Sequence, residues 1–258
     1  MRNIFAVAGI AIKELYRRKD FYVLFILTIL ICVVMATVNI YNNPDIIRYV
    51  KAICLLLIWV SSLVIAITTT ARQIPAEREQ RTLLPLLAKP LSRSELILGK
   101  FFGCWFACGL TLLCFYVFFG VLTASHEHHW PILNYFQAAF MHWIALGIIV
   151  AMALLGSLVF AAPSSNSTIC FIIAAGILFV GRYLGKVALQ MHEPGRFIVS
   201  AIYYAIPHLE FFDLRKLLVH DWPLLEWKFI WLAAGYGAVY MFVFLVAACL
   251  IFRRKAVN

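Results

Sequence analysis

Residues 72–100 read RQIPAEREQRTLLPLLAKPLSRSELILGK, a run of charges and prolines in an otherwise apolar chain. Apolar stretches long enough to cross a lipid bilayer flank this segment on both sides. It must therefore lie in water at one membrane face, divided into short pieces by Pro75, Pro85 and Pro90. A partner molecule can reach the segment there.

The composition places the rest of the chain in a membrane. Its 258 residues are 64% hydrophobic and 13% charged, and the mean hydropathy is +0.91. One globule of this length cannot bury so much apolar surface, so lipid must be the solvent. The net charge of +10 would suit nucleic acid. However, the basic residues cluster at the ends of apolar runs, as anionic lipid headgroups and the positive-inside bias require, and we expect no nucleic-acid partner.

The fold class that follows is an all-α integral membrane protein with six transmembrane helices. Roughly twenty apolar residues cross a hydrocarbon core ~30 Å thick. Six stretches qualify: 21–40, 50–71, 101–124, 135–161, 168–189 and 229–252. Residues 1–20 predict a basic amphipathic helix at the membrane surface. We expect residues 1–258 to form one transmembrane domain.

The distribution of Lys and Arg predicts the orientation of these spans. Most of the basic residues fall in 1–20, in 72–100 and after 252, and an even number of spans puts these segments on one side. The positive-inside rule makes that side cytosolic. Both termini are then cytosolic, residues 190–228 are external, and the expected location is the inner membrane of a bacterium.

Residue patterns typical of enzymes do not stand out. No span has a charged residue in its middle, which argues against an ion-coupled transport site. Gly99-Lys100 lacks the Ser or Thr and the upstream glycine of a phosphate-binding loop. We therefore expect no catalytic residue and no cofactor in this chain. Gly99 and Gly103, followed by Cys104 and Cys108, instead predict a close helix contact.

The charged segment predicts two helix starts. Pro75 suits a first helical turn, the carboxylates of Glu77 and Glu79 favour the positive end of that helix, and Pro85 cannot continue it. A helix of about ten residues follows. Ser92 with Glu95 three residues later forms a capping box that begins the third span. The residues alone leave open whether the short helix docks on a partner or is a solvated loop.

Residues 77–100 resemble the signature of type-2 ABC transporter permeases. In that family an acidic pair precedes Gly-Thr-Leu, a Leu-Leu-Ala-x-Pro stretch, Ser-Arg and a terminal Gly-Lys. One departure is Arg81, where the family usually has glycine, so a tight turn is less favoured there. The later stretch PHLEFFD, residues 207–213, is similar to the family's Pro-Asn-x-x-x-Phe-Asp element.

The resemblance implies a permease subunit that pairs with a second permease, identical or paralogous, and with two separate ATPase subunits that bind ATP and Mg. An external accessory protein is a further partner to consider. The family places a coupling helix against the ATPase, and short external helices before the last span that either re-enter the membrane or, on the plainer reading, lie on its outer surface. The residues carried over are Glu77, Arg78, Glu79, Arg81 and Thr82 for coupling; Pro75, Pro85, Pro90, Ser92, Arg93, Glu95, Gly99 and Lys100 for the structure of the segment; and Pro207, Glu210, Phe212 and Asp213 for the external element.

The histidines carry the remaining hint of chemistry. His126, His128 and His129 lie close enough together to collect Zn or Cu, but an interfacial position beside Trp130 explains them better, and no metal is favoured. The first function hypothesis is an ATP-driven exporter, or a relative that performs mechanical work across the membrane. The alternative is a non-transporting membrane scaffold or assembly factor, for example in maturation of an external metalloenzyme. The substrate stays open.

Overall fold

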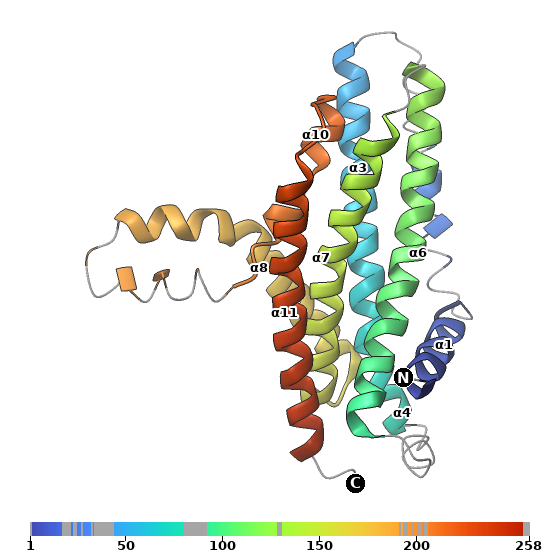
Figure 1. Ribbon diagram of the computed structural model, residues 1–258, viewed down its shortest axis with the longest axis vertical. Coiled ribbons are helices and arrows are strands. Elements are labelled where there is room, and N and C mark those ends of the chain that lie inside the picture. Colours follow the sequence, from blue (N-terminus) through green and yellow to red (C-terminus); the bar gives the residue numbers. More distant parts are fainter. Residues whose placement is uncertain are drawn as a thin grey trace.

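The computed structural model is an elongated bundle in which most helices share the long axis (Figure 1). It describes residues 2–16, 22, 25, 26, 28–31, 33, 44–79, 92–127, 131–190, 192, 196, 197, 199, 200, 203 and 206–254, and every regular element among them is a helix. In chain order these are α1 (Arg2–Tyr16), α3 (Pro44–Ala71), α4 (Gln73–Glu79), α6 (Arg93–Glu127), α7 (Ile132–Val159), α8 (Pro163–Gln190), the 3-10 helix η2 (Leu209–Phe212), α10 (Arg215–Val219) and α11 (Trp227–Arg254).

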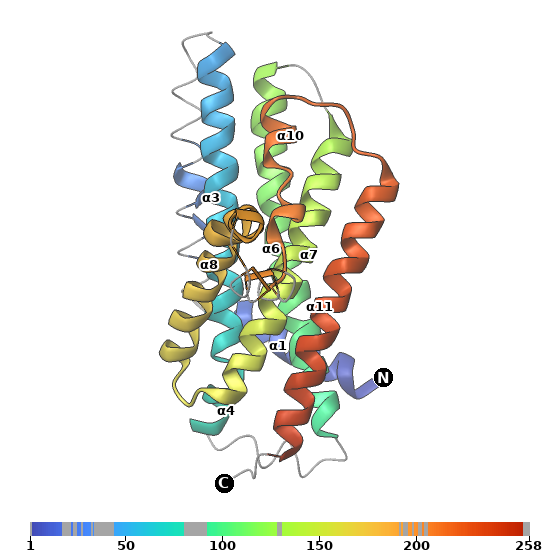
Figure 2. The same cartoon turned by 90° about the vertical axis from the view of Figure 1, so that its left-hand side faces the viewer.

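The two ends of the bundle gather different segments. Helices α1 and α4, the turn between α7 and α8, and the end of α11 lie at the lower end in Figures 1 and 2. The start of α3, the end of α6 and helix α10 lie in the upper part. This arrangement matches the predicted layout, in which the N-terminal helix, the charged segment and the C-terminus share one face.

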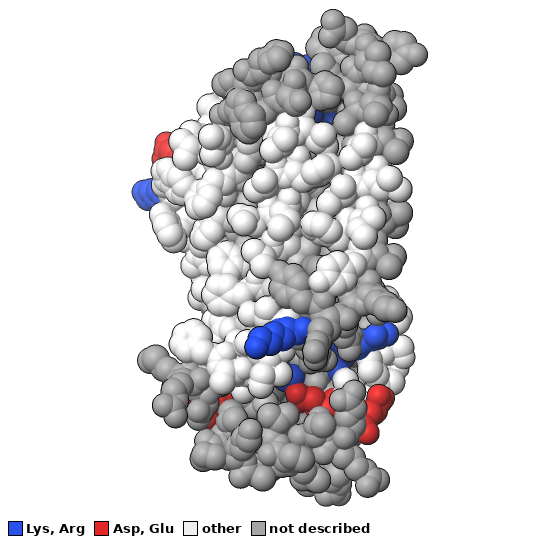
Figure 3. Space-filling model, turned by 90° about the vertical axis from the view of Figure 1, so that its right-hand side faces the viewer, with Lys and Arg blue, Asp and Glu red and all other residues white. Residues whose placement is uncertain are grey.

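Four helical stretches within the described residues are long and apolar enough to cross a membrane: Arg48–Glu77, Arg93–Thr123, Ile132–Val159 and Trp227–Arg254. The first of them comprises most of α3 and of the short helix α4 that follows it. The four stretches overlap the predicted spans 50–71, 101–124, 135–161 and 229–252. The described surface agrees, because the described side chains over the middle of the face in Figure 3 are uncharged, while charged side chains gather toward its lower end. The chain is therefore an all-α membrane protein.

The structure does not confirm the other two predicted spans. Predicted span 21–40 falls mostly outside the described residues. Helix α8 covers the predicted span 168–189, but only Pro163–Phe179 counts as an apolar helix among the described side chains. The second half of α8 turns away from the bundle in Figures 1 and 2. Six spans thus stay a prediction.

Helix α7 is the centre of the bundle. It contacts α3, α6, α8 and α11 as well as η2 and α10. In the most apolar part of α7, 78% of the residues are buried, whereas 28% are buried in the corresponding part of α11. Helix α7 is therefore enclosed by protein, whereas α11 offers most of its surface to lipid.

A reciprocal tryptophan pair joins α6 to α7. The indole Nε1 of Trp105 donates to the carbonyl oxygen of Trp143 over 2.9 Å, and Nε1 of Trp143 donates to the carbonyl oxygen of Trp105 over 3.1 Å. The two rings stack with centroids 4.5 Å apart. A glycine four residues after each tryptophan, Gly109 and Gly147, leaves room for the partner's indole, since a Cβ there would collide with it. Both indole N–H groups are thus satisfied inside the bundle.

Helix α1 packs against the start of α6 through small residues. Val7, Ala8 and Ala11 are buried, while Phe5 and Ile10 on the other side are exposed. A Cβ at Gly103 would lie 2.7 Å from Cβ of Ala11 and 2.8 Å from the carbonyl oxygen of Ala8. The predicted close helix contact is therefore present at Gly103, and its partner is the N-terminal helix.

We expect Gly103→Ala to lower the stability of the protein by ~1–3 kcal/mol, because the new methyl group has no room against α1. Gly9→Ala is the matched control on α1, since a Cβ at Gly9 meets no heavy atom within 4 Å. Replacing this helical glycine should stabilise by up to ~1 kcal/mol. Thermal unfolding of the detergent-purified variants measures both effects. Equal melting temperatures for the two variants would contradict the close packing.

Candidate functional site

The predicted coupling segment begins with a short helix that is fastened to the bundle. Helix α3 ends at Ala71, a turn at Arg72 follows, and α4 covers Gln73–Glu79 with Pro75 in its first turn, as predicted. Gln73, Ile74 and Pro75 are buried, and α4 contacts α7. Within the described residues the helix has seven residues, and the predicted length of about ten stays a prediction, because residues 80–91 lie outside the described residues. Arg81, Thr82, Pro85 and Pro90 lie outside the described residues, as does the side chain of Arg78.

Lys100 holds α4 in place from α6. Its Nζ lies 2.6 Å from Oε1 of Glu77 and donates to Oε1 of Gln73 over 2.9 Å. The side chains of Lys100 and Glu77 are only 3% and 14% exposed. A buried ammonium needs such partners, because isolated charges are costly to remove from water. Glu77, which the resemblance assigns to the contact with the ATPase, is therefore part of an internal ion pair, whereas Glu79 is exposed.

The far end of the same segment is also anchored. The backbone N–H of Ser92 donates to Oε2 of Glu95 over 2.9 Å, and the N–H of Glu95 donates to Oγ of Ser92 over 3.2 Å, so the predicted capping box is confirmed. The next residue, Arg93, donates from Nη1 to the carbonyl oxygens of Phe252 and Arg253 over 2.9 and 3.3 Å. A guanidinium at these last carbonyls favours the C-terminal end of α11.

The predicted external element lies inside the bundle. Pro207 and Phe212 are buried, and Glu210 is half-buried. The ring of Phe212 packs closely against Gly237 of α11, where a Cβ would lie 3.1 Å from the ring. The Asp213 carboxylate receives two hydrogen bonds of 2.7 Å from Nε and Nη2 of Arg215. Its Oδ1 also accepts the N–H of Arg215 over 3.3 Å.

The Asp213–Arg215 pair reaches the middle of a predicted span. The guanidinium of Arg215 lies 5.2 Å from the ring centroid of Trp59, and Trp59 stands halfway along the predicted span 50–71. The cation and the indole ring attract each other, and the carboxylate compensates the charge. Trp59 in turn stacks on His142, with ring centroids 5.6 Å apart.

His142 is buried at this level, with only 2% of its surface exposed. Its Nε2 lies 3.0 Å from Oγ of Ser62, and its Nδ1 lies 3.4 Å from the hydroxyl of Tyr116. His142 belongs to the predicted span 135–161, and its side chain joins α3, α6 and α7 within the core. Ser62 donates its own proton to the carbonyl oxygen of Ile58 over 2.7 Å, so its oxygen can accept a hydrogen bond from Nε2 of His142.

Further hydrogen bonds and an ion pair hold residues 206–226 between α3, α7 and α11. Gln137 donates from Nε2 to the carbonyl oxygen of Leu225 over 2.9 Å and accepts the N–H of Leu225 over 3.2 Å. Nζ of Lys51 lies 3.3 Å from Oδ1 of Asp221. Asp221 has a φ of 50°, and Trp222 donates its N–H to the carbonyl oxygen of Leu217, which closes the end of α10. The backbone N–H of His208 donates to the hydroxyl of Tyr236 over 3.0 Å.

Sequence reasoning missed Lys51, Gln137 and Arg215 as anchors of this element. A signal existed for Gln137, since an amide in the first turn of the apolar span predicted for residues 135–161 requires a polar partner when buried. Nothing in the sequence pointed from Arg215 to Trp59, which lies more than 150 residues earlier.

The candidate metal ligands are not tested by the structure. His128 and His129 lie outside the described residues, and so does the side chain of His126. Among the residues that are described, no group of three or more His, Cys, Asp or Glu side chains could hold a metal ion. The expectation that no metal is bound thus stays a prediction.

Comparison with known proteins places almost the whole chain in one family. Residues 5–257 match the family model described as ABC-2 family transporter protein. A search of curated proteins finds no match to the chain. The match spans both the segment around α4 and the element of residues 206–226, so both belong to the matched architecture.

We expect Lys100→Met and Glu77→Gln each to destabilise the protein by ~3 kcal/mol, because each leaves a buried charge without its ion-pair partner. The double variant should cost less than the sum of the single variants, by more than ~1 kcal/mol. Thermal unfolding of the four proteins completes this double-mutant cycle. Additive effects would show that Lys100 and Glu77 do not stabilise each other.

Proposed function

Because the chain belongs to the ABC-2 family of transporter proteins, we propose that it dimerises in the membrane and couples ATP hydrolysis by separate ATPase subunits to export or to mechanical work. An ABC transporter permease of this family works with an ABC ATPase subunit. Two copies of that subunit, with ATP and Mg bound to them, would serve the dimer. The second permease is either another copy of this chain or a paralogue, and an external accessory protein would complete a mechanical assembly. The chain itself then hydrolyses no ATP.

The attachment of α4 is the observation that carries this proposal. The buried contacts of Lys100 with Glu77 and Gln73 fix α4 to α6, and the peptide link at Arg72 joins it to α3. A helix held in this way moves together with two long helices. A force applied to its exposed side would therefore reach the membrane spans. A solvated loop would yield to the same force instead.

The surface offered to the ATPase is the exposed side of this helix. Glu79 is exposed at the last residue of α4, and Arg78, Arg81 and Thr82 complete the proposed coupling residues. Glu77 lies on the opposite, inner side of α4, where its ion pair with Lys100 holds the helix in place. Pro75 begins the helix, and the cap of Ser92 and Glu95 starts α6, so both ends of the segment have a defined structure.

The element of residues 206–226 supports a re-entrant arrangement in preference to helices lying on the outer surface. Its Asp213–Arg215 pair lies against Trp59, near the middle of a predicted span. A surface-lying pair of helices would keep these charges at the membrane edge. Pairing of the carboxylate with the guanidinium lowers the free-energy cost of placing these charges at this depth.

The orientation proposed for the bacterial inner membrane has both termini in the cytosol. Lys13, Arg72, Arg253 and Arg254 are exposed among the described residues of the lower end, together with α4. Such an excess of basic residues is typical of the cytosolic side. In this arrangement the ATPase subunits are cytosolic, and residues 206–226 enter the bundle from the external side.

We expect Glu79→Lys to weaken recovery of the co-expressed ATPase subunit at least tenfold, because desolvated interface charges contribute ~2 kcal/mol or more. Co-purification and ATPase activity measure the effect. Glu226→Lys is the matched control, since Glu226 is exposed next to α11 at the opposite end. Unchanged ATPase recovery and unchanged activity in Glu79→Lys would favour the non-transporting scaffold.

The orientation has its own measurement, single-cysteine labelling in a background without the native cysteines. Cysteine at Ser165 or Arg254 should react with an impermeant maleimide only after the membrane is opened, whereas cysteine at Glu226 should react in intact cells. All three positions are exposed. Labelling of Glu226→Cys only from the inside would refute this topology.

A further inference from the structure

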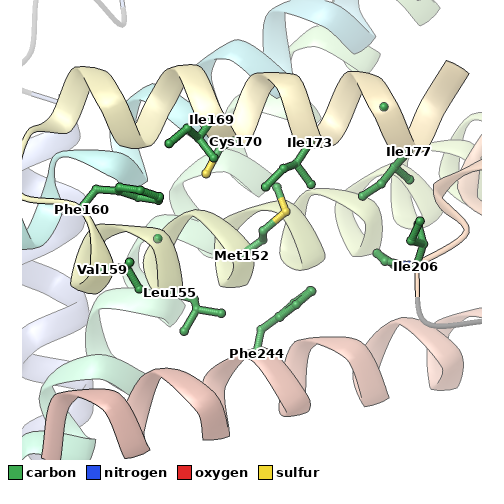
Figure 4. A pocket seen from close by; sticks show the side chains of 13 residues that line it. Met152, Leu155, Val159, Phe160, Ile169, Cys170, Ile173, Ile177, Ile206 and Phe244 are labelled. Carbon is green, nitrogen blue, oxygen red and sulfur yellow. The ribbon is translucent and has the colours of Figure 1, made fainter. Parts of the chain in front are cut away.

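A lateral cavity of about 730 Å³ lies between α7, α8 and α11 (Figure 4). Met152 and Leu155 of α7, Ile173 and Ile177 of α8, and Phe244 of α11 point into it. Phe160 lies at one end, at the turn between α7 and α8, and Ile206 lies at the other. The cavity therefore runs from the lower end of the bundle toward its middle.

The side chains that line this cavity cannot hold water. They are aliphatic, aromatic or sulfur-bearing, and two glycines complete the wall. A buried water needs about two to four polar partners, and an apolar cavity without them stays dry. Among the described residues that line the cavity, Cys170 is the one whose side chain forms a hydrogen bond, which it donates to Oδ1 of Asn166. The space therefore suits an apolar occupant.

The dimensions favour a flexible chain over a protein helix. The wall from Ile169 to Ile177 is about 12 Å long at 1.5 Å per residue. The volume then corresponds to a mean cross-section of roughly 60 Å², whereas a helix with a diameter of ~10 Å needs about 80 Å². The length is also close to the ~15 Å depth of one leaflet of the hydrocarbon core.

The entrance suits an amphiphile from the same leaflet. Ser164, Ser165 and Thr168 are exposed where α8 begins, next to Phe160. Hydroxyl groups at that level can hydrogen-bond a polar headgroup while the acyl chain follows the apolar wall. Ile206 and Pro207, which begin the re-entrant element, close the inner end.

We infer that this cavity is a binding site for the acyl chains of a membrane phospholipid from the leaflet on the α4 side. The occupant contacts α7, α8, α11 and the first residues of the element 206–226. The inference does not depend on ATP coupling, so it holds for an exporter and for a scaffold alike.

The test is photo-crosslinking of the full-length protein in detergent with an equimolar amount of phosphatidylglycerol that carries a diazirine in the middle of one acyl chain. Detergent replaces loosely bound lipid, so only a defined site is labelled. We expect cross-links at Met152, Ile173 and Phe244, mapped by mass spectrometry. Labelling spread evenly over exposed residues such as Phe242 and Ile172 would overturn the inference.

Filling the cavity provides the decisive variant. A Cβ at Gly176, which lines the cavity, would meet no heavy atom within 4 Å, so Gly176→Leu can be accommodated. Cross-linking should fall at least fivefold. Gly235→Leu is the matched control, because Gly235 is equally open but lies outside the lining residues. Unchanged cross-linking in Gly176→Leu would refute the site.

A second pair of variants guards against a folding defect in the first. Ile173→Trp should lower cross-linking in the same way, whereas Ile172→Trp on the exposed side of α8 should not. A second copy of the chain is the competing occupant. An intermolecular disulfide formed by Ile173→Cys, in a background without native cysteines, would show that a protein surface fills the cavity and would overturn the lipid assignment.

Discussion

Lipid as the surrounding solvent makes every buried polar group of this bundle depend on a partner inside the protein. Lys100 meets Glu77 and Gln73, and Arg215 meets Asp213 and Trp59. In water such pairs would contribute little, because exposed charges are screened. In an apolar surrounding, loss of one partner leaves a costly charge behind. These contacts therefore determine which segments are fixed to the spans.

Helix α3 links the two fastened ends of the molecule. Its first half carries Lys51 and Trp59, which hold the element 206–226, and its last residue leads through Arg72 into α4. Over 28 residues the helix is about 42 Å long. A displacement of α4 thus has a physical route to the far side of the bundle. His142 and Ser62 join α3 to the central helix α7 along this route.

The apolar cavity and the element of residues 206–226 share residues. Ile206 and Pro207 close the cavity, and the next residue, His208, is held by the hydroxyl of Tyr236 on α11. An acyl chain in the cavity would therefore support the point at which the element enters the bundle. Such a chain and the hydrogen bond of Tyr236 would then position the same few residues.

The sequence by itself determined the class of the protein, because hydropathy depends on composition and the ends of helices depend on local residues. Apolar runs predicted the helices α3, α6, α7 and α11, and Ser92 with Glu95 predicted the start of α6, since a capping box involves neighbours in sequence. Only the tertiary structure decided that Glu77 faces inward to Lys100, that His142 is buried, and that Arg215 reaches Trp59. Contacts between distant residues follow from how helices pack, and helix periodicity alone does not specify that packing.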